Sequence, residues 1–124
     1  MSITNIKTED LISETDVGAS TITMRLVGSA ETDAKTGLDV LLRGIHETAL
    51  TAKVTEVVVD LRALEFMNSS CIKAFVSWIG AIQDGPPGSQ YKLRILSDSK
   101  KHWQGRSLTA LACFAADLIH IETS

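Results

Sequence analysis

The segment DLRALEFMNSSCIKAF, residues 60–75, places two hydroxyl side chains where an apolar strand gives way to an apolar helix. Ser69 and Ser70 are neighbours, with Asn68 before them and Cys71 after them. A serine hydroxyl in such a place can receive a phosphoryl group, act as a nucleophile, or cap the helix. These three chemistries correspond to a switch, an enzyme and a plain scaffold.

Helix capping explains part of this pattern. Asn and Ser are both favourable N-caps, and a cap contributes about 1 kcal/mol to stability. Two further features favour a switch. The hydroxyls lie at the carboxyl end of a strand, where sites on mixed sheets collect. They also precede the unpaired N–H groups of a helix, whose positive dipole end tolerates a phosphate.

An enzymatic role for Ser69 would need a base and a group to orient that base. The segment lacks the Gly-x-Ser-x-Gly pattern of a nucleophile elbow. The three histidines, His46, His102 and His120, have no spacing that pairs one of them with Ser69. Cys71 could be a reactive thiol at a helix start, but burial as a small residue is the favoured interpretation. We therefore expect no catalytic residue.

Composition narrows the class of protein. The 124 residues carry a formal net charge of −3, so the chain has no basic excess for a nucleic-acid backbone. Cys71 and Cys113 are far apart, which disfavours a disulfide or a zinc site. No glycine-rich nucleotide loop is present, and we expect no metal and no cofactor. Neither a secretory signal nor a membrane span is evident, so we expect a cytoplasmic protein.

Strand and helix patterns alternate along the chain after an initial hairpin. Ile22, Met24 and Leu26 alternate with polar residues, as in a half-buried strand, whereas Val57-Val58-Val59 suggests a strand covered on both faces. The predicted elements are strands at 11–15 and 20–27 around a turn at 16–18, a helix with apolar positions 38–52, a strand at 54–61, a helix with apolar positions 72–79, a strand at 91–95, a helix with apolar positions 108–115, and a strand at 118–121.

The order ββαβαβαβ predicts one α/β domain over residues 1–124, with a mixed sheet of about five strands and helices mainly on one face. Asp33 is expected to cap the first helix, and Ser97 or Ser99 the third. The segment Gly85-Pro86-Pro87-Gly88 is expected to end the second helix.

Residues 57–73 resemble the STAS domain, the fold of anti-sigma-factor antagonists. That family has a strand, Asp-Leu, an apolar pair, then Asp-Ser-Ser or Asp-Ser-Thr before Gly-Leu at a helix start. The order of elements also matches over nearly the whole chain. Asn68 stands where the family usually has Asp, and Cys71 where it usually has Gly. The corresponding segments here are Val57-Val58-Val59-Asp60-Leu61, Phe66-Met67 and Asn68-Ser69-Ser70-Cys71-Ile72.

The resemblance implies a non-enzymatic protein-binding module that is switched by phosphorylation. A serine/threonine kinase, often the anti-sigma factor itself, would phosphorylate Ser69, with Ser70 as second choice, and a phosphatase would reset it. Asn68, Ser70, Cys71 and Lys73 would form the switch surface, and Asn68 would orient the reacting hydroxyl. No nucleic-acid or membrane partner is implied.

Two other functions stay open. The sequence Asn-Ser-Ser-Cys-Ile-Lys-Ala is closer to a divergent SiaC-like branch of the STAS proteins, in which the unphosphorylated form engages a diguanylate cyclase. Alternatively, the chain is a structural subunit of a signalling complex whose serines only cap the helix.

Two segments beyond the serines have open roles. Trp78 is either packed at the edge of the core or exposed as an anchor for a partner. Residues 100–106 combine basic and aromatic side chains, and a solvated helix start with one anchoring tryptophan is favoured over a contact patch.

Overall fold

The computed structural model describes residues 3–86 and 88–124. Residues 1–2 and Pro87, the latter part of the predicted stop to the second helix, lie outside the described residues. Its elements are β1 (Leu11–Val17), β2 (Thr21–Ala30), the 3-10 helix η1 (Thr32–Ala34), α1 (Lys35–Ala52), β3 (Glu56–Asp60), β4 (Leu64–Met67), α2 (Ser69–Gln83), β5 (Lys92–Ser97), α3 (His102–Phe114) and β6 (Ile119–Thr123).

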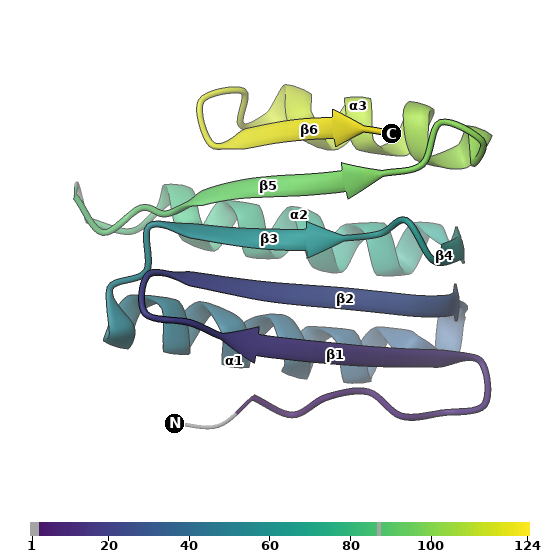
Figure 1. The fold of residues 1–124 in the computed structure, drawn as a ribbon, viewed down its shortest axis with the longest axis horizontal. Coiled ribbons are helices and arrows are strands. Elements are labelled where there is room, and N and C mark those ends of the chain that lie inside the picture. The colour runs from purple at the N-terminus through teal and green to yellow at the C-terminus, as the bar shows by residue number, and fades with distance from the viewer. Residues whose placement is uncertain (1–2, 87) are drawn as a thin grey trace.

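The sheet has the strand order β1-β2-β3-β5-β6. Only the β1–β2 hairpin is antiparallel, and all other described strand pairs are parallel. Helices α1, α2 and α3 connect successive parallel strands and all lie against the same face of the sheet (Figure 1). The expected α/β architecture, a mixed sheet with an N-terminal hairpin and helices on one face, is confirmed.

One strand, β4, was not predicted. It is four residues long and pairs in parallel with the end of β2. Its burial does not alternate, because Leu64 and Met67 are buried while Glu65 and Phe66 are exposed. A sequence of this length and pattern carries no strand signal. The sheet therefore has six strands rather than about five.

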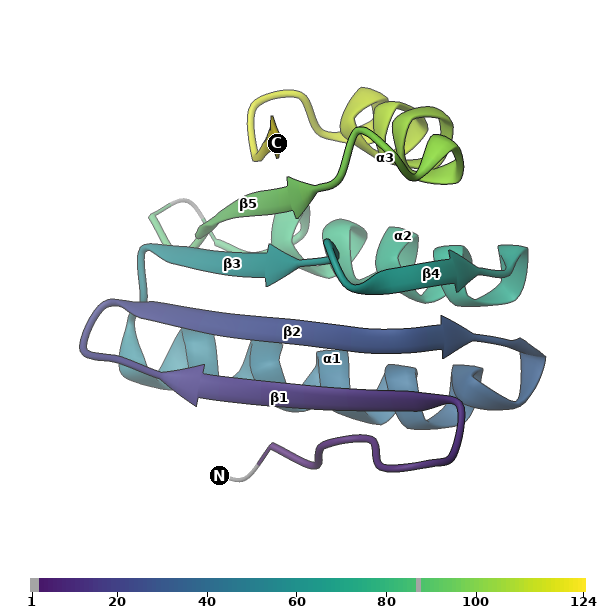
Figure 2. The same ribbon diagram turned by 45° about the vertical axis from the view of Figure 1, so that its right-hand side comes forward.

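Strand β2 pairs with two strands on the same side, first β3 and then β4. The register shifts between Gly28 and Ser29. Figure 2 shows β4 continuing beyond the end of β3, alongside β2. Gly28 has φ +113°, a conformation that L side chains rarely adopt, and a Cβ there would lie 2.1 Å from the carbonyl oxygen of Asp10. Only glycine fits this irregularity in the strand.

Two predicted helix caps are wrong. Asp33 lies inside η1, which runs directly into α1, and the N-cap of α1 is Ala34, which has no side-chain cap. Helix α3 begins at His102 with Lys101 as its N-cap, so Ser97 and Ser99 lie too far from its first N–H groups. Both predictions assumed that a helix begins close after a capping residue. In both places an intervening turn moves that start.

The core lies between the sheet and its three helices. Helix α2 buries Phe75 and Ile79 as expected, but its other predicted apolar positions, Ile72 and Val76, are only partly buried. Trp78 is 3% exposed, and its Nε1–H donates to the hydroxyl of Tyr91 at 2.7 Å. Core packing is therefore the role of Trp78 in this structure.

The most deeply buried polar residue, Gln104, lies in the segment predicted to be solvated. Its Nε2 donates to the carbonyl oxygens of Leu61 and Leu64, at 2.6 and 3.1 Å, and its Oε1 accepts from the amide of Asp98 at 2.8 Å. Trp103 packs against the core while half-buried. Helix α3 is thus hydrogen-bonded to the loop between β3 and β4, which leads to Ser69.

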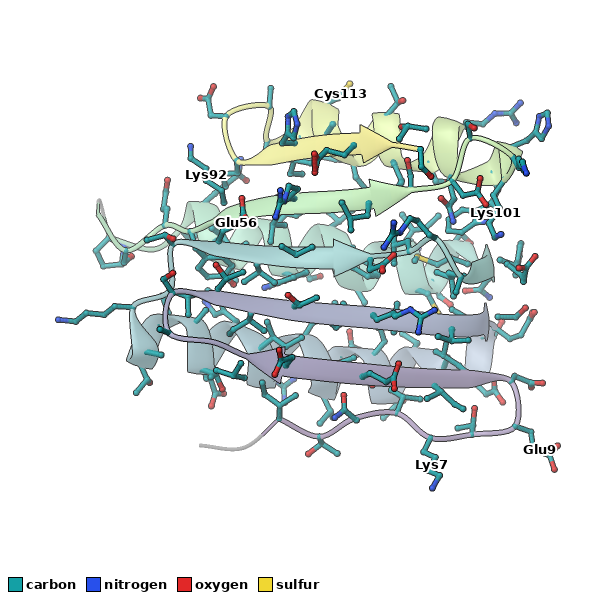
Figure 3. The ribbon with its side chains drawn as sticks, viewed as in Figure 1. Lys7, Glu9, Glu56, Lys92, Lys101 and Cys113 are labelled. Carbon is teal, nitrogen blue, oxygen red and sulfur yellow. The ribbon has the colours of Figure 1, made fainter. Side chains whose placement is uncertain are left out.

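No helix within residues 3–86 and 88–124 lies over the other face of the sheet, which carries ion pairs. Arg25 lies 3.4 Å from Glu14 and 3.9 Å from Asp60, and Arg62 bonds Asp60 at 2.9 Å. The hydrogen bonds from Arg62 hold the pKa of Asp60 below its usual range. A second set joins Arg94 to Glu56 and Glu122, at 3.3 and 3.4 Å. Figure 3 shows this face with its side chains, Glu56 among them.

The strained position of Gly28 gives the first prediction. Replacing Gly28 with alanine should lower the free energy of unfolding by at least about 2 kcal/mol, because φ is positive and the new Cβ meets backbone. Gly80→Ala is the matched control. Its Cβ would have nothing within 4 Å, and alanine favours the α2 helix, so stability should be unchanged or rise. Urea unfolding measures both variants. Equal stabilities of the two would contradict the role of Gly28.

Candidate functional site

The candidate site lies where three segments meet. Strand β4 delivers the chain to Asn68, helix α2 starts at Ser69, and the end of β2 with η1 lies beside them. The amide of Asn68 donates to the carbonyl oxygen of Ala30 at 2.9 Å, which continues the β2–β4 pairing up to the helix. The position of the serines is thus set by the sheet.

Asn68 organises the start of α2. Its Oδ1 accepts hydrogen bonds from the backbone amides of Ser70 and Cys71, at 3.1 and 3.2 Å. Its Nδ2 donates to Thr32 Oγ1 at 2.6 Å, which ties the helix to η1. This is an N-cap by side chain, as the sequence predicted for Asn68. Because the amide group makes all of these bonds, neither serine is needed as the cap.

The two serine hydroxyls differ in their surroundings. The Ser70 hydroxyl donates to Asn68 Oδ1 at 2.7 Å and is half-buried. Ser69 is exposed, and its hydroxyl makes no hydrogen bond to any residue in the described parts of the chain. In this structure Asn68 thus orients the hydroxyl of Ser70 and not that of Ser69.

The backbone donors at the helix start are less available than expected. Of the first three amides of α2, those of Ser70 and Cys71 already bond Asn68 Oδ1. The expectation of unpaired N–H groups here is wrong for these two residues, because the cap uses them. A phosphate on Ser69 would depend on the Ser69 amide, the helix dipole and nearby cations.

Lys73 is a cation in the right place to contact such a phosphate. It lies four residues after Ser69 on α2, and both side chains are exposed. Residues four apart on a helix face the same side, where opposite charges attract. Ser77 continues the same exposed line one turn further along. Ser69, Lys73 and Ser77 therefore lie along one accessible stripe of α2.

Cys71 is part of the core beneath the site. It is fully buried, and its thiol donates to the carbonyl oxygen of Glu31 at 3.3 Å. Burial raises the pKa of this thiol, which disfavours the reactive thiolate. The interpretation of Cys71 as a small buried residue is confirmed. Its thiol hydrogen bond links the first turn of α2 to Glu31, the residue that precedes η1.

Two residues near the site were missed by the sequence analysis. Phe66 is 42% exposed on β4, three residues before Ser69, although its type suggested a core position. Thr32 accepts the Asn68 amide from a segment 36 residues earlier. An exposed aromatic ring is a common anchor for a protein partner. No local sequence pattern indicates either role. The exposure of Phe66 depends on the pairing of β4 with β2, and the bond of Thr32 depends on a contact between segments far apart in the chain.

The ring of His46 bonds Tyr91, while His102 and His120 are exposed, and none of the three bonds Ser69. No cluster of three or more metal-ligating side chains occurs within residues 3–86 and 88–124. No helix in those same ranges has the length and apolar character needed to cross a bilayer.

Solved structures of anti-sigma factor antagonists are similar to this chain over most of its length. An anti-sigma factor antagonist from Mycobacterium paratuberculosis superposes with a TM-score of 0.61 at 12% identity, covering 85% of this chain and 82% of the other. The anti-sigma factor antagonist SpoIIAA in its unphosphorylated form gives 0.62 at 16%, covering 90% and 89%.

The Bacillus cell fate determinant SpoIIAA in its phosphorylated form gives a TM-score of 0.56 at 17% identity, covering 90% of this chain and 92% of the other. No protein-family model and no curated protein matches the sequence. The chain therefore has the fold of the anti-sigma factor antagonists, the STAS fold that its sequence resembles.

The bonds of Asn68 give the second prediction. Asn68→Ala removes the cap and the bond to Thr32, and should lower the free energy of unfolding by about 1–2 kcal/mol. Asn68→Asp keeps an acceptor for both amides, and Thr32 can donate to the new carboxylate. It should therefore stay within about 0.5 kcal/mol of the wild type. Urea unfolding distinguishes them, and equal losses in both variants would contradict the capping role of Oδ1.

Proposed function

We propose that this chain is a non-enzymatic regulatory module of the anti-sigma-factor-antagonist type, switched by reversible phosphorylation of Ser69. One observation carries the choice of residue. Ser69 presents an exposed hydroxyl at the start of α2 that makes no hydrogen bond with the residues the structure describes, whereas the hydroxyl of Ser70 is held by Asn68. A kinase must reach the hydroxyl that it modifies, and the free one needs no bond broken.

The structural neighbours support this proposal. SpoIIAA, which has the same fold, is an anti-sigma factor antagonist with both an unphosphorylated and a phosphorylated form. By analogy, the partner of this chain is an anti-sigma factor that is also a serine/threonine kinase, and a protein phosphatase reverses its action.

The switch would act through charge at the surface. Phosphorylation adds about −1.5 to −2 charges at neutral pH. Lys73 and the helix dipole accommodate that charge within this chain, but a partner surface fitted to a neutral serine does not. A mismatch of ~3 kcal/mol would weaken the complex by about a hundredfold.

The exposed aromatic ring of Phe66 gives the unphosphorylated form an apolar contact beside Ser69. A partner that packs on Phe66 would bring its own surface over the serine. Contact at an aromatic anchor excludes water, and a phosphate dianion in the same interface would lose its hydration. The two residues together define a surface that one modification can open or close.

A diguanylate cyclase is the second candidate partner. The sequence Asn68 to Ala74 favours it, because the SiaC-like branch that it resembles uses its unphosphorylated form to engage such an enzyme. A structural subunit with capping serines is the third. The bonds of Asn68 weaken that alternative, since the cap is complete without the hydroxyl of Ser69.

The choice between the serines gives the third prediction. Protein purified from its native cell should carry one phosphate that phosphatase removes, as seen by intact mass. Ser69→Ala should abolish this phosphate and keep binding to the partner, because alanine leaves the surface neutral. Ser70→Ala should keep the phosphate. Phosphorylation of the Ser69→Ala protein to the wild-type extent would assign the modification to another residue.

The fourth prediction concerns how Lys73 and the helix dipole accommodate a negative charge on Ser69. Phosphorylated Ser69, or Ser69→Glu, should shift amide resonances near residues 68–73 and leave those of α1 and α3 in place, while the partner is lost. Ser77→Glu adds the same charge two turns along α2 and is the matched control, with a smaller loss of binding. Widespread shifts across α1 and α3 would mean that the domain rearranges, contrary to a surface-charge switch.

A further inference from the structure

A cavity of about 360 Å³ opens to solvent between α1 and α2, on the helical side of the sheet. Its size lies within the range of small-molecule sites, at the lower end. Leu42 of α1 and Ala74, Trp78 and Ala81 of α2 supply its apolar lining. This cavity lies apart from Ser69, which does not line it.

The polar groups at the cavity have a fixed hydrogen-bond pattern. Trp78 Nε1–H donates to the hydroxyl oxygen of Tyr91 at 2.7 Å. The indole has no acceptor, so the Tyr91 proton is free to go to His46 Nδ1, which lies 2.7 Å away. His46 Nδ1 is then the acceptor, and in the neutral ring the proton sits on Nε2. Burial lowers the pKa of His46, which favours that neutral ring.

His46 lines the cavity, and in this tautomer the one donor that its ring keeps is Nε2–H, because its other nitrogen is engaged by Tyr91. Arg43, one turn earlier on α1, also lines the cavity and forms no ion pair or hydrogen bond with any residue that the structure describes. Lys35 and Asp39, at the same cavity, neutralise one another at 2.8 Å. The uncompensated charge of the lining is thus positive, from Arg43.

We propose that the α1–α2 cavity binds a small carboxylate with an apolar body. The carboxylate would take hydrogen bonds from the Arg43 guanidinium and His46 Nε2–H, and its apolar part would lie against Leu42, Trp78 and Ala81. An apolar pocket with a few convergent polar groups is the usual form of such a site, and a guanidinium matches the geometry of a carboxylate.

Benzoate is the probe, and benzamide is its neutral control of the same shape. The chain has two tryptophans, so an ¹⁵N-labelled sample gives two indole signals. Trp78 lines the cavity and Trp103 does not. Benzoate should shift the Trp78 indole and the amides of residues 42–46 and 74–81 in a saturable way, with a Kd of about 1 mM as befits a ligand of this size. The Trp103 indole should not move.

Benzamide should bind at least about tenfold more weakly than benzoate, because it lacks the charge that Arg43 attracts. Arg43→Gln should weaken benzoate binding by about tenfold or more. The matched control is Lys53→Gln, which removes one positive charge from the end of α1 outside the cavity and should bind benzoate as the wild type does. Both replaced side chains are exposed, so the fold should survive in each variant.

Three results would overturn the proposal. One is the absence of a saturable Trp78 shift at about tenfold the expected Kd. Another is equal binding of benzamide, which would mean that the cavity does not read the carboxylate. The third is an equal weakening of benzoate binding by Arg43→Gln and by Lys53→Gln. This result would mean that benzoate is attracted by the general positive charge and not by Arg43 in the cavity. Each of these measurements uses the unphosphorylated chain alone, so the result does not depend on the function of Ser69.

Discussion

The candidate site depends on a backbone constraint at Gly28. Strand β2 must pair with β3 along its first half and with β4 along its second, and the shift between them requires a positive φ. Without that irregularity β4 would lose its register, and Asn68 would not meet the carbonyl of Ala30. A residue 40 positions before Asn68 thus sets where α2 begins. The sheet therefore sets where the serines lie, and Asn68 sets the hydrogen bonding of the Ser70 hydroxyl.

Asn68 gives the two adjacent hydroxyls different surroundings, because it accepts a hydrogen bond from Ser70 and not from Ser69. Its single oxygen receives two amides and the Ser70 hydroxyl, so the local hydrogen-bonding capacity is used without Ser69. The helix start is stable with one serine committed to structure and the other left to solvent. A chemical change at Ser69 would therefore leave the N-cap intact. A modification of the Ser70 hydroxyl would disrupt the cap, because that hydroxyl bonds Asn68 Oδ1.

Most of the fold was readable from the sequence because its long elements have clear periodicity. The alternation in β2 and the apolar run in β3 placed both strands, and Asn68 was correctly expected at a helix start. The rest depends on contacts that no local pattern encodes. Strand β4 exists because β2 supplies a partner, and Phe66 is exposed as a result. Asn68 bonds the hydroxyl of Ser70 and not that of Ser69, and this choice follows from side-chain geometry.

The bonds of Gln104 have a dynamic consequence. The buried side-chain amide of Gln104 bonds the carbonyl of Leu61 in the β3–β4 loop, the carbonyl of Leu64 at the start of β4, and the backbone amide of Asp98 before α3. If α3 moved away from the sheet, those three groups would lose the hydrogen bonds of Gln104 in a place that water reaches poorly, at a cost set by their desolvation. The Leu61 carbonyl would keep its bond from the Leu64 amide. Opening of the helix and of the loop is therefore cooperative. In hydrogen exchange, the backbone amides of α3 and of the β3–β4 loop should therefore be protected to the same degree. The segment that leads to Ser69 would share the protection of the C-terminal helix.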